Sequence, residues 1–224
     1  MKKKLSILLS LAFVVGICCV PAMAIKSVTQ YEPEDILSEE QIQREQVSGW
    51  AKDVVNTAKA LGMIPAFTDN PAFTGTITRE QFAELVVKMV ETVLGEEMEA
   101  ASPDTFSDTT NPAVLKACQA GIIAGVGDGK FAPKLSTNRE QIATMIDRAA
   151  QYLSAKLGEN LTPNVGNMEV FSDRGDISIW AAASMAALVG NGIMSGTSAT
   201  TISPKDTCTV EQSILMVYRV YEKA

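Results

Sequence analysis

The feature that most constrains the fold is an internal repeat, since a chain that repeats itself is expected to build several copies of one unit. A Trp-Ala pair stands twelve residues before a glycine at Trp50 and again at Trp180. Residues 111–123 contain the equivalent glycine, Gly121, but lack the tryptophan. Phe-Ser-Asp opens the second copy at Phe106 and the third at Phe171. We therefore expect three related segments.

Each copy continues into a loop and then into a related tetrad of residues. The tetrads read Thr-Arg-Glu-Gln at 78–81, Asn-Arg-Glu-Gln at 138–141 and Thr-Val-Glu-Gln at 209–212. A Ser, Thr or Asn that precedes a Gln by three residues is typical of a capping box at a helix start. The predicted capping residues are Thr78 with Gln81, Asn138 with Gln141, and Thr209 with Gln212.

Apolar residues after each tetrad recur with helical spacing, over 82–93, 142–153 and 214–221. A single amphipathic hairpin cannot bury its own stripe, so the three are expected to pack their stripes together. The predicted fold is mainly α: three helix-loop-helix repeats packed as a pseudo-threefold helical bundle with short extended loop segments. The expected divisions are a signal peptide at 1–24, an acidic lead-in at 25–45, a first repeat with its connector at 46–104, a second repeat at 105–165 and a third at 166–224.

The N-terminus has the layout of a secretory leader. Three lysines at 2–4 precede an apolar run over 5–20, and the small-x-small triplet 22–24 follows. We expect cleavage after Ala24, export, and no membrane insertion of the mature chain. Two cysteines remain after cleavage, and Cys118 and Cys208 either form a disulfide or stay as buried free thiols.

Composition excludes several classes of function. The formal charge is −7, and removal of three leader lysines makes it −10, so no basic field favours nucleic acid. The chain has no histidine, which rules out histidine triads and histidine-ligated zinc. Glu80, Glu140 and Glu211 are the repeated carboxylates, but in the first turn of a helix a carboxylate simply favours the helix dipole. We predict no enzyme activity, no metal and no cofactor.

The tetrad arginines, Arg79 and Arg139, need a separate explanation because a cation opposes the dipole at a helix start. Such an arginine, together with helix amides, can form a site for a carboxylate or phosphate. The alternative is an exposed arginine that pairs with a neighbouring acid. Val210 replaces the arginine in the third copy, which should cripple that site for anions.

The tryptophans and aspartates also leave two interpretations open. Trp50 and Trp180 are either core anchors or platforms for a sugar ring, and both roles are compatible if one face is exposed. Asp108 and Asp173 are either turn residues or acceptors for sugar hydroxyls. Asp128 is interpreted as a turn residue rather than part of a calcium loop.

The ordered set of motifs resembles the S-layer homology family, with Thr-Arg-Glu-Gln and Asn-Arg-Glu-Gln where the family has Thr-Arg-Ala-Glu. The resemblance implies non-covalent binding to secondary cell-wall polysaccharide, often pyruvylated, at the cell wall or S-layer outside the cell. It implies that the tetrad arginine contacts the acidic ketal and that groove residues hold the sugars. The implied ligand-binding residues are Arg79, Arg139, Asp108, Asp173, Trp50 and Trp180.

No copy carries the whole pattern, so at most two competent grooves are expected. The first copy lacks the Phe-Ser-Asp entry, the second lacks the tryptophan and the third lacks the arginine. The alternative function is that of a protein-binding adaptor or structural component of the cell envelope, with a protein partner in the same grooves.

Overall fold

A computed structural model of the chain describes residues 38–224. The predicted leader and most of the acidic lead-in fall within residues 1–37, outside the described part. Within residues 38–224, no helix combines the length and apolar character that crossing a membrane requires.

The prediction of a mainly α fold is confirmed. Short α2 (Glu39–Arg44) precedes three pairs of helices, each made of a shorter and a longer member. The pairs are α3 (Lys52–Ala60) with α4 (Arg79–Leu94), α5 (Pro112–Gln119) with α6 (Arg139–Leu157), and α7 (Ala182–Gly190) with α8 (Val210–Tyr221). Single 3₁₀ turns lie at η2 (Pro103–Thr105), η3 (Met168–Val170) and η4 (Arg174–Asp176).

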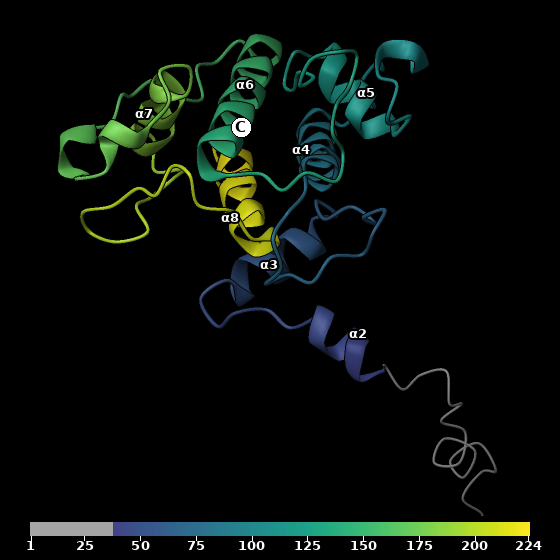
Figure 1. Cartoon of the computed structure of the whole chain (residues 1–224), viewed down its shortest axis with the longest axis horizontal. Helices are drawn as coiled ribbons and strands as arrows, with labels where there is room; N and C mark the ends of the chain where they lie inside the picture. The colour runs from purple at the N-terminus through teal and green to yellow at the C-terminus, as the bar shows by residue number, and fades with distance from the viewer. Residues whose placement is uncertain (1–37) are drawn as a thin grey trace, which may run out of the picture. The chain divides into compact units, whose positions relative to one another are not determined.

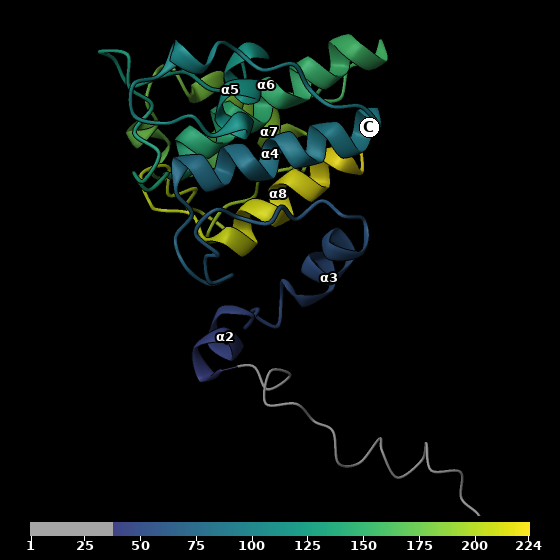
Figure 2. The same ribbon diagram turned by 90° about the vertical axis from the view of Figure 1, so that its right-hand side faces the viewer.

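The longer helices form the centre of the bundle. α4, α6 and α8 contact one another pairwise, and each carries one shorter helix on its outer side (Figure 1, Figure 2). α5 packs against α4 and α7 against α6, so each outer helix covers the central helix of the preceding copy. α3 of the first copy packs against α8 of the third, which closes the order into a ring.

The stripes predicted from sequence line the interior of this bundle. Amphipathic central helices bury one face against each other because removing apolar surface from water is the main favourable term in folding. The fully or almost fully buried side chains of the central helices include Phe82, Leu85, Val86, Met89, Val90, Ile142, Met145, Ile146, Leu153, Ile214 and Val217.

A closed ring of backbone hydrogen bonds joins the three segments that precede the central helices. The Ile77 amide donates to the Cys208 carbonyl at 2.9 Å, the Cys208 amide to the Thr137 carbonyl at 3.3 Å, and the Thr137 amide to the Ile77 carbonyl at 3.1 Å. All three residues are completely buried. Residues on either side form isolated antiparallel bridges, so these are the short extended segments of the fold. The ring fixes three tetrads at one end of the bundle.

Each central helix begins with a complete capping box. The side chains of Thr78, Asn138 and Thr209 accept the amides of Gln81, Gln141 and Gln212, and each glutamine side chain accepts the amide of its capping partner. Local sequence alone specifies this arrangement, since both partners lie within one helical turn.

The remaining amides at the helix starts are used by the loop of the next copy. In α4, the amides of Arg79 and Glu80 donate to the Leu135 and Pro133 carbonyls at 2.9 and 3.1 Å. α6 makes the equivalent bonds to Asp206 and Pro204, and α8 to Gly75 and Phe73. The helix starts therefore have no spare first-turn amides for an anion, and that part of the sequence interpretation is wrong.

The tetrad glutamates connect the same pairs of copies. Glu211 accepts the Ser48 amide at 2.9 Å and the Ser48 hydroxyl at 2.7 Å. Glu140 holds Ser178 in the same way, at 2.9 and 3.0 Å. Glu80 accepts the Thr109 hydroxyl at 3.2 Å. The three carboxylates are buried, so their role in the described structure is to attach each outer helix to the preceding copy.

The two remaining cysteines are unpaired. Cys118 is half-buried, and Cys208 lies fully buried in the backbone ring. Burial raises the pKa of the Cys208 thiol, although Arg139 acts in the opposite direction. Of the two alternatives left open by the sequence, the structure has the free thiols.

Thr78→Ala and Thr209→Ala should each lower the free energy of unfolding by about 1 kcal/mol, because each removes the acceptor for a first-turn amide. Urea denaturation measures the change. Thr57→Ala is the matched control, since Thr57 is an exposed residue inside α3 whose hydroxyl donates to the Asp53 carbonyl. Equal effects at Thr57 and Thr78 would contradict the capping role.

Candidate ligand-binding grooves

The tetrad arginines are buried and hold the loop of the next copy. Arg79 is 7% exposed; its Nε donates to the Phe131 carbonyl at 2.9 Å and its Nη2 to the Ala124 carbonyl at 2.8 Å. The guanidinium also lies 4.5 Å from the centre of the Phe131 ring. These contacts explain a cation at a helix start, because carbonyl oxygens and an aromatic face replace the water that the charge loses.

Arg139 repeats the arrangement one copy later. It is 6% exposed, and it donates to the Ile202 carbonyl at 2.9 Å through Nε and to the Ser195 carbonyl at 2.7 Å through Nη2. Burial lowers the pKa of both guanidinium groups, and the aspartates nearby act in the opposite direction. The alternative of an exposed arginine paired with a surface acid is wrong for both residues.

The aspartates of the Phe-Ser-Asp entries fix the same loops from within their own copy. Asp108 accepts the amides of Phe131 and Ala132, both at 2.8 Å. Asp173 accepts those of Ile202 at 2.9 Å and Ser203 at 2.7 Å. These bonds favour the turn role over contact with sugar hydroxyls.

The amide hydrogen bonds also set the acidity of these aspartates. The hydrogen bond from Phe131 lowers the pKa of Asp108 below its usual value. At Asp173, desolvation acts to raise the pKa, but the amides of Ile202 and Ser203 outweigh it and the pKa is lowered. Hydrogen bonds to the ionised form favour that form, so both carboxylates stay charged at neutral pH.

Two loop glycines are required by close packing. A Cβ at Gly125 would lie 2.7 Å from the Lys130 carbonyl oxygen and 3.0 Å from the Phe106 ring. A Cβ at Gly196 would lie 2.4 Å from the Ser198 carbonyl oxygen and 2.8 Å from the Phe171 ring. The phenylalanine of each entry thus presses on the glycine of its own loop, which explains why the two motifs occur together.

Both tryptophans are exposed at groove edges rather than buried as core anchors. Trp50 is 56% exposed and Trp180 is 54% exposed, and each lies just before an outer helix. Each lines a hollow that is also lined by the buried arginine of a different copy. The structure therefore brings tryptophan and arginine together from copies that are far apart in sequence.

We call the two hollows groove A and groove B. Groove A has a volume of about 250 Å³ and is lined by Arg79, Ala124, Gly125, Gln141, Thr144, Met145, Arg148 and Trp180. Groove B has a volume of about 380 Å³ and is lined by Arg139, Ser195, Gly196, Thr197, Gln212, Leu215, Met216, Arg219 and Trp50. The two sets occupy equivalent positions, and each groove takes residues from all three copies.

Sequence reasoning missed a second cation in each groove. Arg148 lies on α6 in groove A, and Arg219 lies on α8 in groove B. A cation stands nine residues after the second tetrad position in every copy, at Lys88, Arg148 and Arg219. This regular spacing was available in the sequence, but only the fold shows that the cations reach the grooves.

The third hollow between copies, groove C, differs in chemistry. It is lined by Pro65, Ala66, Glu84, Val87, Lys88, Glu91, Asn111, Pro112, Ala113 and Lys116. Val210, the counterpart of the tetrad arginines, is fully buried and does not line it. No tryptophan precedes α5. The missing arginine of copy three and the missing tryptophan of copy two thus affect the same groove, and grooves A and B keep both residues.

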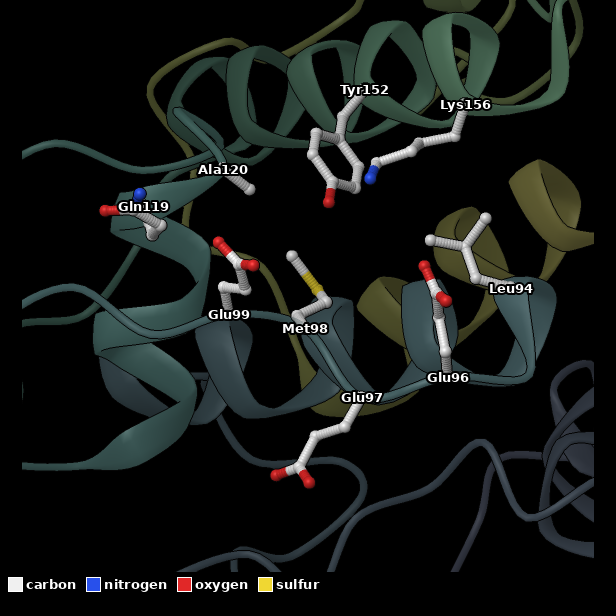
Figure 3. A pocket seen from close by; sticks show the side chains of 9 residues that line it. All are labelled: Leu94, Glu96, Glu97, Met98, Glu99, Gln119, Ala120, Tyr152 and Lys156. Atoms are coloured by element: carbon white, nitrogen blue, oxygen red, sulfur yellow. The ribbon is translucent and has the colours of Figure 1, made fainter.

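A further hollow of about 360 Å³ lies near the C-terminal ends of α4, α5 and α6 (Figure 3). Glu96 and Glu99 point into it from the connector after α4, whereas Glu97 points away. Lys156 and Tyr152 of α6 form the opposite side, with the Lys156 ammonium 5.6 Å from the ring centre. Two carboxylates make this hollow unfavourable for an anionic ligand.

Interlocked copies with grooves between them define a repeat-built binding module. Residues 104–143 and 170–210 match the family model of the S-layer homology domain, which anchors proteins at the cell surface, typically on cell-wall polymers. Both matched segments run from a Phe-Ser-Asp entry to the start of a central helix. Residues 46–103 lie outside them, although α3 covers the central helix of another copy, α8, as α5 covers α4 and α7 covers α6.

The chain is also similar to an endoglucanase of Bacillus sp. (strain KSM-635), with 31% identity over 148 residues. The match covers 64% of the chain but only 15% of the endoglucanase. The similarity therefore gives no evidence of catalysis in this chain. Within residues 38–224, no cluster of acidic or cysteine side chains could hold a metal ion.

Arg79→Ala should lower the free energy of unfolding by about 1.5–3 kcal/mol, because it removes two charge-assisted hydrogen bonds to loop carbonyls. Urea denaturation tests it. Val210→Ala keeps an apolar residue at the equivalent position of the third copy and controls for general loss of side-chain volume. A wild-type midpoint for Arg79→Ala would show that the loop does not depend on the guanidinium.

Asp108→Asn should destabilise the protein at neutral pH but not in acid. The folded-state pKa of Asp108 is lowered, so its stabilisation is complete above the unfolded-state pKa, near 3.8, and is lost as pH falls through the folded value. Urea midpoints from pH 7 to pH 2 should converge for wild type and variant. Asp104→Asn, at an exposed aspartate nearby, should give parallel curves.

Proposed function

We propose that the protein attaches non-covalently to an acidic cell-wall polysaccharide through grooves A and B. The observation that carries this proposal is the double occurrence of one set of residues: an exposed tryptophan, two arginines and a loop glycine that line the same groove. An aromatic face suits the apolar side of a sugar ring, and guanidinium groups suit a carboxylate. A pyruvylated polymer would supply both groups.

Exposure of the tryptophans supports ligand contact. Each leaves more than half of a large apolar side chain in water, although burial would have been favourable. Both lie in a groove where a ligand can cover them, and the groove positions are equivalent in the two places. A repeated exposed aromatic residue at a hollow is a feature of binding sites rather than of inert surface.

Charge distribution is consistent with a local anion site. The whole chain is acidic, with a net charge of −7, so an anionic polymer would be repelled by most of the surface. In grooves A and B the lining residues include two arginines each and no acid. Groove C combines two lysines with two glutamates, so it offers no comparable excess of positive charge.

Attachment outside the cell requires export, and the predicted leader at residues 1–24 would provide it. The alternative function, binding of a protein partner in the same grooves, differs in the sensitivity of the ligand to protease. A protein partner would be removed from wall material by protease treatment, whereas a polysaccharide would not.

The test is co-sedimentation of the mature protein, residues 25–224, with protease-treated wall sacculi before and after extraction of accessory polysaccharide. We expect binding that disappears after extraction. Loss of binding after protease treatment alone would support the protein-partner alternative, and no binding to any preparation would overturn the proposal.

Trp50→Ala and Trp180→Ala should each weaken binding roughly tenfold at their own groove, equivalent to about 1.4 kcal/mol. Folding should be unaffected because both side chains are exposed. Ile179→Ala is the matched control, since Ile179 is 97% exposed beside Trp180 but does not line the groove. A comparable loss at Ile179 would mean that general surface hydrophobicity, rather than the groove, holds the ligand.

A further inference from the structure

We propose that Arg148 in groove A and Arg219 in groove B are the residues that contact the acidic group of the ligand, while the tetrad arginines act as positioning residues. This inference rests on the proposed function. The inference assigns recognition of the ligand's charge to residues outside the tetrads. In each groove one arginine then has a structural role and the other binds the ligand.

The tetrad arginines are buried and already bound to the adjacent loop. In both, Nε and Nη2 donate to carbonyls of the adjacent loop, and more than nine-tenths of the residue is buried. A carboxylate is bound best by two parallel N–H groups of one guanidinium. With one edge of each fork occupied by backbone carbonyls, Arg79 and Arg139 fix the loop that shapes the groove.

Arg148 has its full set of donors available. It is exposed on α6, and within residues 38–224 it makes no hydrogen bond, ion pair or ring contact. It lines the same hollow as Trp180. A ligand with a sugar ring on the indole can therefore place its carboxylate against an unoccupied guanidinium, which needs no rearrangement of the loop.

Arg219 is partly engaged but keeps much of its fork. It is half-buried on α8, and its Nη1 donates to the Ile193 carbonyl at 3.1 Å. Nε and Nη2 make no hydrogen bond within residues 38–224, and Arg219 lines groove B. The contact with Ile193 orients the side chain, so groove B presents a more restrained cation than groove A.

Lys88 is the counterpart of Arg148 and Arg219 in a groove that lacks both the tryptophan and the tetrad arginine. It stands at the equivalent place on α4 and lines groove C, where Glu84 and Glu91 also lie. A lysine cannot form the planar fork, and the neighbouring carboxylates offset its charge. Lys88 is therefore an internal control for a cation at this helix position that takes no part in binding.

The test isolates groove A by using Trp50→Ala as the background, which removes the aromatic side of groove B. The probe is polysaccharide extracted from wall sacculi, used either intact or after mild acid has hydrolysed its ketals and released the carboxylate-bearing groups. Binding is measured by titration calorimetry. Arg148→Ala should weaken binding of the intact probe at least tenfold, and Lys88→Ala should change it less than twofold. Arg148→Lys should restore only part of the loss, because the ammonium lacks the fork.

The hydrolysed probe distinguishes charge recognition from general contact. It should bind the Trp50→Ala background and the Arg148→Ala variant made in it equally, because the hydrolysed probe has no carboxylate for Arg148 to bind. Unchanged binding of the intact probe by Arg148→Ala would overturn the inference while leaving the proposed function in place. An equal loss with both probes would also overturn it. Failure of the wild type to bind either probe would overturn the proposed function, and the inference with it.

The midpoint temperature of thermal unfolding should be unchanged in Arg148→Ala and lowered in Arg79→Ala.

Discussion

The arrangement of the molecule depends on the closed cycle of backbone hydrogen bonds among Ile77, Thr137 and Cys208. Each of these residues donates to one neighbour and accepts from the other, so the three copies can satisfy buried backbone groups only when all three are present. The cycle brings every tetrad within reach of the loop that follows in the ring. The capping boxes, the loop anchors and the grooves are all consequences of that proximity.

Within this frame, the four tetrad positions have separate tasks. The first and fourth close the capping box inside one helix, as at Thr78 and Gln81. The second and third reach into the next copy, where Arg79 holds the loop and Glu80 holds the start of the outer helix. One short motif therefore specifies a helix start and an interface between copies. Replacement of the arginine by Val210 removes only the loop contact, and α8 still forms with its box intact.

The sequence predicted the features that depend on local chemistry. Helical periodicity and capping residues act within a few positions, so the central helices could be located from the chain alone. The partners of Arg79 and Asp108 could not, because they lie on a loop whose position is fixed by packing between copies. For the same reason the losses of arginine and tryptophan looked like defects of different copies, whereas in the fold groove C is the groove whose lining has neither residue. Arg148 was missed because its regular spacing has no meaning until α6 is placed beside Trp180.

The packing of α3 against α8 gives the ring a further property. In an open solenoid the terminal repeats need special capping units, and repeats can be added along the axis. Here the last copy receives its cover from the first, and Glu211 binds Ser48 across the junction. No copy is terminal, so none has an end face to protect, and there is no place at which a fourth could be inserted without opening the hydrogen-bonded cycle. The number of copies is set by closure, and the unit that can be gained or lost as a stable body is the complete set of three.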